Sequence, residues 1–155
     1  MYILVLHNIR SAENVGSMFR TADAFGIHKI YLTGYTPAPV DRFKRPVSKI
    51  AKTALGAEKA VSWEKGEVVN VVSKLKQDGV RIIALEQDNR SAPLLSYMIT
   101  LPLALVVGNE VDGIDPETLA LCDDVVEIPM HGSKESLNVA VAAGIALHTF
   151  AQARH

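Results

Sequence analysis

Short apolar runs rich in β-branched residues alternate along the chain with segments of helical periodicity. The apolar runs predict strands at residues 2–6, 29–33, 81–86, 103–108 and 125–128. Helical spacing predicts helices at residues 14–25, 47–55, 67–77 and 136–151, with weaker helical signals at 91–98 and 116–121. Because the predicted strands are apolar throughout, we expect a parallel sheet covered by helices on both faces, which is an α/β fold.

One long loop interrupts this alternation. Residues 33–46 contain three prolines, and loops of this length often carry function. The chain of 155 residues shows no internal repeat and no linker that would separate two units. We therefore expect residues 1–155 to form a single domain.

The composition argues against several classes of protein. Hydrophobic residues make up 48% of the chain, which argues against disorder. The net charge of -1 excludes a general polycation, so affinity for nucleic acid requires a local patch. Cys122 is the single cysteine, so no internal disulfide can form. Since Met1 leads directly into a predicted strand and no run of about 18 apolar residues occurs, we expect a cytoplasmic protein with no membrane partner.

Polar residues follow the first predicted strand and open the next helix. Arg20 lies away from the apolar stripe of that helix, where it is either a ligand for a phosphate or oxyanion or a solvated surface group. Asn14 is either a site residue or the N-cap of the helix. Gly16 either lets a ligand approach closely or simply relieves crowding.

A second polar loop, at residues 108–117, follows another apolar strand. Asn109 and Glu110 lie where the strand ends, and ligands of α/β sheets bind at the carboxyl ends of parallel strands. Asp115 and Pro116 are explained as the cap and first turn of a short helix. The carboxylates of this loop do not have the spacing of a calcium site, and the histidines do not have the spacing of a metal motif. We expect no metal.

The third polar loop precedes the last helix. Ser136 is either the N-cap of this helix or a ligand, and Asn138 would then lie in its first turn. From Leu137 to Ala151 the helix is apolar nearly all round, so we expect it to be buried, in part by a second copy of the chain.

A cluster of cations lies between these loops, in residues 42–52. The segment contains Arg42, Lys44, Arg45, Lys49 and Lys52 and no acid. Such a cluster either binds an RNA backbone or is a solvated loop.

Taken together, three segments resemble the motifs of the SpoU/TrmH-type RNA ribose methyltransferases of the SPOUT superfamily. The segments are NIRSAENVGSMFRTADAFGI, LVVGNEVDGI and IPMHGSKESLNVAVAAGIAL, and their order and spacing also match. KTALGAEKAV at residues 52–61 is similar to the same family, so the resemblance covers nearly the whole chain. A departure is Ala140, which stands where a second serine is common after SLNV.

The resemblance implies a fold and an activity. The fold is a SPOUT-type parallel sheet flanked by helices, with a C-terminal trefoil knot, in a homodimer. The activity is transfer of a methyl group from S-adenosylmethionine to a ribose 2′-hydroxyl of RNA, with tRNA expected in preference to rRNA. Ribose methylation of rRNA and a non-catalytic RNA-binding module are the alternatives.

The resemblance also assigns site residues. The residues implied in catalysis are Arg20, Asn14, Glu110, Ser136 and Asn138. Those implied in cofactor binding, mostly through the backbone, are Leu85, Gly108, Asn109, Ile128, Met130 and Leu137. For contacts with RNA we expect the cations Arg10, Arg42, Lys44, Arg45 and Lys49.

Overall fold

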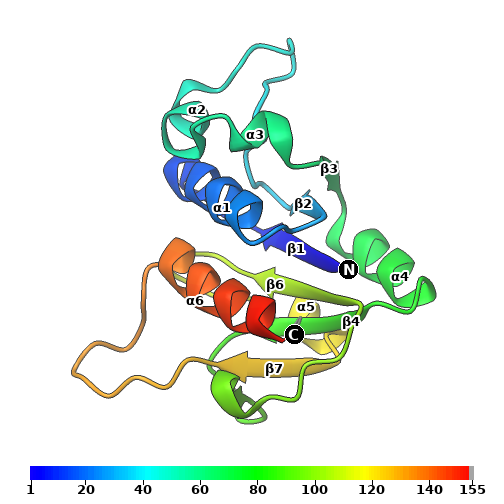
Figure 1. The fold of residues 1–155 in the computed structure, drawn as a ribbon, viewed down its shortest axis with the longest axis vertical. Coiled ribbons are helices and arrows are strands. Elements are labelled where there is room, and N and C mark those ends of the chain that lie inside the picture. Colours follow the sequence, from blue (N-terminus) through cyan, green and yellow to red (C-terminus); the bar gives the residue numbers. More distant parts are fainter. Residues whose placement is uncertain (154–155) are drawn as a thin grey trace.

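Seven parallel strands form one sheet in the computed structural model, which describes residues 1–153 (Figure 1). Their order across the sheet is β3-β2-β1-β6-β4-β7-β5. The strands are β1 (Tyr2–His7), β2 (Lys29–Thr33), β3 (Trp63–Gly66), β4 (Arg81–Leu85), β5 (Ala92–Pro93), β6 (Leu103–Val107) and β7 (Asp124–Glu127). Because all are parallel, their carboxyl ends lie along one edge.

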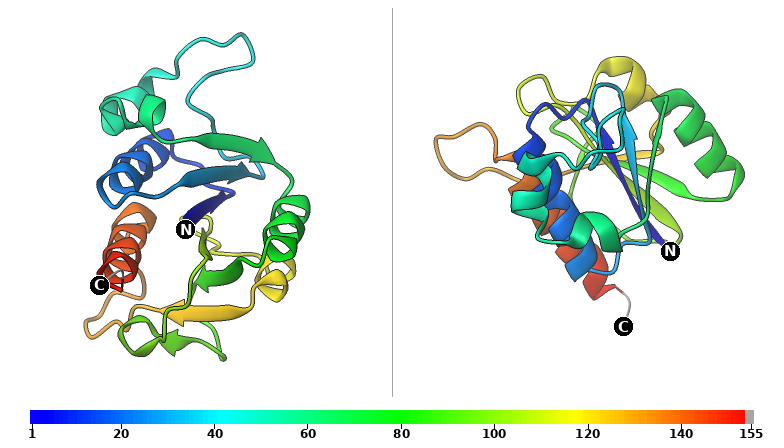
Figure 2. Two further views of the ribbon diagram at one scale, coloured as in Figure 1. Left: turned by 45° about the vertical axis from the view of Figure 1, so that its right-hand side comes forward. Right: turned by 90° about the horizontal axis from the view of Figure 1, so that it is seen from above.

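Helices cover both faces of this sheet. They are α1 (Ala12–Ala24), α2 (Ser48–Ala54), α3 (Ala57–Ala60), α4 (Val68–Gln77), α5 (Pro116–Leu121) and α6 (Val139–Gln152), with a 3-10 turn η1 (Leu94–Ser96). Figure 2 shows α1, α2 and α6 on one side of the sheet and α4 and α5 on the other. The result is a three-layer α/β/α arrangement.

Alternate residues of each strand supply two separate cores. In β1, Leu4 and Leu6 pack in the layer of α1 and α6, while Ile3 and Val5 pack in the layer of α4 and α5. This division explains the apolar runs of the sequence, because a strand covered on both faces has no solvent-facing side. The predicted α/β fold with a parallel sheet is therefore confirmed.

Most predicted elements are present, and one prediction is wrong. Residues 91–98, which carry a weak helical signal, form the edge strand β5 and the turn η1. Pro93 has no N–H to donate, and β5 pairs only with β7 at the edge of the sheet, where proline is tolerated. The short elements β3 and α3 were not predicted, because four residues carry too little periodicity to detect.

The last helix begins at Val139, three residues later than expected, because Asn138 is its N-cap. The single chain leaves part of this helix uncovered, since Val141 and Ile145 are 52% and 40% exposed. The two residues are one turn apart and form an apolar stripe on the outer face of α6.

Close packing between α1 and α2 decides the role of Gly16. A Cβ at this position would overlap with Thr53 Oγ1 and with the backbone carbonyl oxygen of Ile50. Gly16 therefore relieves crowding between helices and is not a point of ligand approach.

Among residues 1–153, no helix combines the length and the apolar character needed to cross a bilayer.

We predict that Gly16→Ala lowers the free energy of unfolding by about 1–3 kcal/mol, because the added methyl group forces α1 and α2 apart. Gly132→Ala is the matched control, since nothing lies within 4 Å of a Cβ built there. Urea unfolding of both variants measures the difference. Equal stability of the two would contradict the close-contact role of Gly16.

Candidate active site

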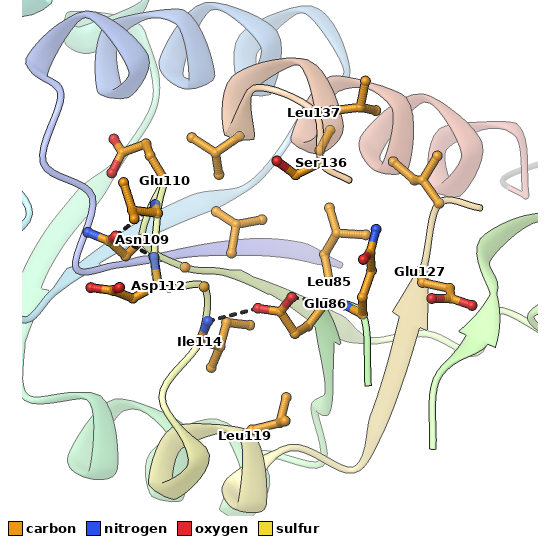
Figure 3. Close-up of a pocket in the computed structure, with 18 of the residues that line it drawn as sticks. Leu85, Glu86, Asn109, Glu110, Asp112, Ile114, Leu119, Glu127, Ser136 and Leu137 are labelled. Carbon is orange, nitrogen blue, oxygen red and sulfur yellow. Dashed lines mark hydrogen bonds between the residues drawn. The ribbon is translucent and has the colours of Figure 1, made fainter. Parts of the chain in front are cut away.

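A pocket of about 390 Å³ opens at the carboxyl edge of the sheet. Its walls come from the segments that follow β4, β6 and β7 and from the start of α6 (Figure 3). These segments are distant in sequence but meet because the parallel strands end side by side. The lining residues are Leu85, Glu86, Gln87, Val107, Gly108, Asn109, Glu110, Val111, Asp112, Gly113, Ile114, Leu119, Glu127, Ile128, Met130, Ser136, Leu137, Val139 and Ala142.

All six residues expected to bind the cofactor line this pocket. They are Leu85, Gly108, Asn109, Ile128, Met130 and Leu137. Two of the five expected catalytic residues, Glu110 and Ser136, line it as well. The structure thus brings together residues from both C-terminal motifs.

The sequence analysis missed two acidic side chains in the pocket. Glu86 lies directly after β4, and its Oε2 accepts a hydrogen bond from Ile114 N at 2.9 Å. Glu127 ends β7. Glu86 ends the predicted strand at 81–86, so a polar residue at the end of an apolar run was the signal that could have identified it. Glu127 lies within the predicted strand at 125–128 and gave no such signal.

The loop after β6 is held in a tight turn. Asn109 and Gly113 pair through two backbone hydrogen bonds of 3.0 Å, and Asn109 Oδ1 accepts from Val111 N and Asp112 N at 2.9 Å. A Cβ at Gly108 would lie 2.6 Å from Gly113 O, so only glycine fits beneath this turn. The pocket wall is therefore rigid main chain.

Glu110 connects this loop to the other two motifs. Its carboxylate accepts hydrogen bonds from Arg10 N at 3.1 Å, from Ser11 N at 3.0 Å and from Asn14 Nδ2 at 3.2 Å. Asn14 Oδ1 in turn accepts a hydrogen bond from Asn138 Nδ2 at 3.3 Å. The starts of α1 and α6 are thus joined to the β6 loop at the rim of the pocket.

The structure decides two capping alternatives that the sequence left open. The N-cap of α1 is Ser11, whose hydroxyl accepts from Asn14 N at 3.1 Å, and not Asn14. The N-cap of α6 is Asn138, whose Oδ1 accepts from Ala140 N at 2.8 Å, and not Ser136. The expected cap at Asp115, with Pro116 in the first turn of α5, is confirmed.

Hydrogen bonds also set the charge state of Glu110. Partial burial by itself raises the pKa of the Glu110 carboxyl, but the hydrogen bonds from Ser11 N, Arg10 N and Asn14 outweigh burial and lower the pKa below its ordinary value. Glu110 is therefore an anion near neutral pH. It lies at the N-terminus of α1, where the helix dipole favours negative charge.

The expected catalytic arginine does not line the pocket. Arg20 is exposed, and it makes no hydrogen bond or ion pair with the residues that the structure describes. It lies on α1 about 9 Å further along the helix axis than Asn14, at a rise of about 1.5 Å per residue. Within one chain, Arg20 and the pocket are thus separated.

The expected RNA-binding cations also lie outside the pocket. Arg42, Lys44, Arg45 and Lys49 are exposed on the loop after β2 and on α2, and Arg10 is exposed at the start of α1. Arg45 is not an isolated charge, because its Nε donates to Asp41 Oδ2 at 2.9 Å.

Residues 1–153 contain no group of three or more His, Cys, Asp or Glu side chains arranged to hold a metal ion.

The pocket, its rim and the three motifs extend over almost the whole chain, and so does the match to one protein family. Residues 1–148 match the SpoU rRNA Methylase family. The chain belongs to this family. The resemblance that the sequence indicated is thereby confirmed.

A curated SpoU relative shows how far this similarity extends. The 23S rRNA (guanosine-2'-O-)-methyltransferase RlmB of Nitrosomonas europaea is 38% identical over 152 residues, which are 97% of this chain and 56% of the relative. The chain thus spans a little over half the length of this curated relative.

Two solved structures share the fold. An AdoMet-bound rRNA methyltransferase from Sinorhizobium meliloti superposes with a TM-score of 0.87 and 26% identity, over 98% of this chain and 56% of that one. A structure described as giving insights into the 2-OH methylation of C/U34 on tRNA superposes with a TM-score of 0.82 and 27% identity, over 97% of this chain and 93% of that one.

We predict that Glu110→Gln destabilises the protein by about 1 kcal/mol at pH 7, because an amide offers one acceptor oxygen to three donors. The folded pKa of Glu110 is lowered, so its stabilisation is full above the ordinary value of 4.5 and is lost as pH falls through the folded value. The difference between wild type and variant should therefore shrink below about pH 4.5.

The control for this prediction is Asp112→Asn, which removes an exposed charge from the same loop. Denaturant titrations between pH 3 and pH 7 measure all three proteins. A difference between wild type and Glu110→Gln that does not change with pH would contradict the role of the Glu110 charge.

Proposed function

We propose that this protein transfers a methyl group from S-adenosylmethionine to a ribose 2′-hydroxyl of RNA. The observation that carries the proposal is the rim interaction in which Glu110, Asn14 and Asn138 join three motifs beside the pocket. Membership of the SpoU rRNA Methylase family and the AdoMet-bound neighbour from Sinorhizobium meliloti support it.

The pocket suits S-adenosylmethionine in size and chemistry. Its volume of about 390 Å³ lies in the range of cofactor sites. Leu85, Ile128 and Leu137 offer apolar surface to a purine ring, and the backbone of Gly108 and Asn109 offers fixed polar groups. The carboxylates of Glu86, Glu110, Asp112 and Glu127 make the pocket favourable for a cation. When bound, S-adenosylmethionine supplies a methyl group on a positively charged sulfur.

Arg20 has the chemistry to act on the RNA. Its guanidinium stays protonated at neutral pH, so we assign it no role as a base. It would hold a phosphate of the target nucleotide and stabilise negative charge on the ribose oxygen as the proton leaves to phosphate or solvent. Ser136, which lines the pocket, and Asn138 at its rim would position the ribose.

A homodimer would bring Arg20 to a pocket. Helices α1 and α6 lie side by side (Figures 1 and 2), joined by Asn14 and Asn138 at one end, and a Cβ at Gly144 would lie 3.8 Å from Thr21 further along. The outer face of this pair carries the exposed apolar stripe of Val141 and Ile145, which a second copy of the chain would cover. Across such an interface, Arg20 of one chain would face the pocket of the other.

For the RNA substrate we propose tRNA, with rRNA as the alternative. Support for tRNA comes from the neighbour described with C/U34 of tRNA, of which this chain covers 93%. Support for rRNA comes from the relative in Nitrosomonas europaea. A cytoplasmic location and a single-domain organisation also belong to the proposal.

The C-terminal trefoil knot is part of the same proposal. Its support is family membership and the close approach of the loops after β4 and β7, where Gln87 Nε2 donates to the Glu135 carbonyl at 3.0 Å.

Incubation with S-adenosylmethionine tritiated in its methyl group and with separate tRNA and rRNA pools tests this function. Digestion of the labelled RNA to nucleosides should give a labelled 2′-O-methylnucleoside from the tRNA pool. Label in the rRNA pool would select the alternative substrate, and label on a base would refute ribose methylation. Binding of S-adenosylmethionine without transfer to either pool would favour a non-catalytic module.

In this assay we predict that Arg20→Ala lowers the transfer rate by about 100-fold or more, because charge on the ribose oxygen loses its stabilising donor. Affinity for S-adenosylmethionine, measured by calorimetry, should stay at the wild-type value, since Arg20 does not line the pocket. Lys74→Ala, which removes an exposed cation from α4 on the other face of the sheet, is the control. An active Arg20→Ala variant would refute the assignment.

We also predict that mixing Arg20→Ala chains with Asn138→Ala chains restores about a quarter of wild-type activity. If each site uses Arg20 of one chain and Asn138 of the other, half of the chains form hybrid dimers with one intact site each. Light scattering and native mass spectrometry verify that hybrids form. Hybrids without activity would show that each site lies within one chain.

A further inference from the structure

Phe43 is the most exposed phenylalanine that the structure describes. Its side chain is 62% exposed, whereas Phe19 and Phe150 are fully buried. Phe43 lies near the tip of the loop between β2 and α2, which stands away from the body of the molecule at the top of Figure 1. Core packing therefore does not account for this ring.

Asp41 holds the loop tip in a defined shape. Its Oδ1 accepts hydrogen bonds from Phe43 N at 2.8 Å and from Arg45 N at 3.0 Å, and an isolated bridge between Val40 and Pro46 closes the turn. Because the turn already holds the ring in place, binding of a ligand costs little conformational entropy in this loop.

Two guanidinium groups lie over the ring, and only one of them is held there by an ion pair. The Arg42 and Arg45 Cζ atoms are 4.7 Å and 4.9 Å from the ring centroid of Phe43. Arg45 is also tied to Asp41 by the ion pair. Arg42 has no hydrogen bond or ion pair to any residue in 1–153, so it can leave the ring without breaking one.

The surroundings of the ring are strongly cationic. Asp41 is the only acid between residues 24 and 57, and its carboxylate is occupied by the turn and by Arg45. Lys44 is exposed at the tip and has a φ of 61°, in the left-handed region that non-glycine residues rarely adopt. An exposed aromatic ring beside Arg42 and Lys44, neither of which makes an ion pair with residues 1–153, matches a ligand that has both a flat π-face and phosphates.

The base of the loop is joined to the pocket. Tyr35 Oη accepts a hydrogen bond from Asn109 Nδ2 at 2.9 Å, and Thr36 Oγ1 accepts one from Ile9 N at 3.0 Å. Asn109 lines the pocket. The base of the loop is therefore tied to the pocket wall.

We propose that the loop tip is a stacking site for an unpaired RNA base. The base stacks on the Phe43 ring in place of the Arg42 guanidinium, and Arg42 and Lys44 contact the adjacent phosphates. This inference rests on the proposed function and adds to it that the substrate has an unpaired nucleotide outside the pocket, as the loops of folded RNA do.

Fluorescence anisotropy tests this site with two labelled RNAs of equal length. One is a single strand that forms no hairpin, and the other is a duplex. Phe43→Ala should weaken binding of the single strand by about 10-fold or more, which is the size of a lost base–aromatic stack, and change duplex binding little. Phe43→Trp should retain affinity, and RNA should quench the added tryptophan beyond any change at Trp63. Leu95→Ala, which removes an 87% exposed apolar side chain at η1, is the matched control.

The salt dependence of RNA affinity distinguishes the contribution of the Phe43 ring from that of the cations. Lys44→Ala should reduce the slope of log affinity against log salt by about one, while Phe43→Ala should leave the slope unchanged. Polyglutamate competes for cations but not for a stacking ring, so its affinity should be the same for Phe43→Ala and wild type. A loss of polyglutamate affinity in Phe43→Ala would instead indicate an acidic protein partner and overturn the proposal.

Three further outcomes test the stacking site and the proposed function separately. Wild-type affinity of Phe43→Ala for the single strand, or equal losses for single strand and duplex, would overturn the stacking site. If wild type binds neither RNA but binds S-adenosylmethionine by calorimetry, the RNA part of the proposed function fails and the stacking site fails with it. If RNA binding depends on Phe43 but no methyl transfer occurs, the stacking site stands and the proposed catalysis fails.

Discussion

The Glu110 carboxylate receives three hydrogen bonds at one corner of the pocket, two from main-chain N–H groups that lead into α1 and one from the Asn14 side chain. Asn14 then accepts a hydrogen bond from Asn138, which caps α6. One anion thus fixes the starts of two helices against the loop after β6. Because helix N-termini carry unsatisfied N–H donors, a carboxylate here stabilises the folded chain and holds the pocket rim in place.

The pocket depends on this interaction for its shape. The loop after β6 forms one wall as main chain, and the start of α6 forms another (Figure 3). Their separation is set where Glu110, Asn14 and Asn138 meet. Side chains that look unremarkable in the sequence, such as Leu85 and Ile128, then line a cavity whose polar contacts come from the backbone.

The parts of the molecule that would contact RNA lie elsewhere. Arg20 is on the exposed face of α1, and the cationic loop around Phe43 stands beyond the edge of the pocket. The hydrogen bond between Tyr35 and Asn109 connects this loop to the pocket wall. The separation of an apolar, acidic cavity from a cationic surface suits a reaction between a cationic cofactor and a polyanion.

The sequence by itself determined the layers and part of the pocket lining. Apolar runs identified β1, β2, β4, β6 and β7, and the motifs identified all six residues expected to line the cofactor site. The strands follow from local periodicity, whereas the six residues were assigned by the resemblance to the SpoU/TrmH family. They meet in one pocket because loops at the carboxyl ends of parallel strands converge. Pro93 and the four-residue elements carry no such period, so β3, β5 and α3 were missed or assigned wrongly.

Only the tertiary structure decided what Asn14, Asn138 and Gly16 do. Asn14 had a local explanation as a cap and Asn138 as a first-turn residue, and Gly16 either let a ligand approach or relieved crowding. The chain alone offered no means to choose. The choice depends on partners that are distant in sequence: Glu110 for Asn14, Asn14 for Asn138, and Thr53 for Gly16. A hydrogen bond or a steric contact between such segments exists only once the sheet has brought them within a few ångströms, and no local pattern records it.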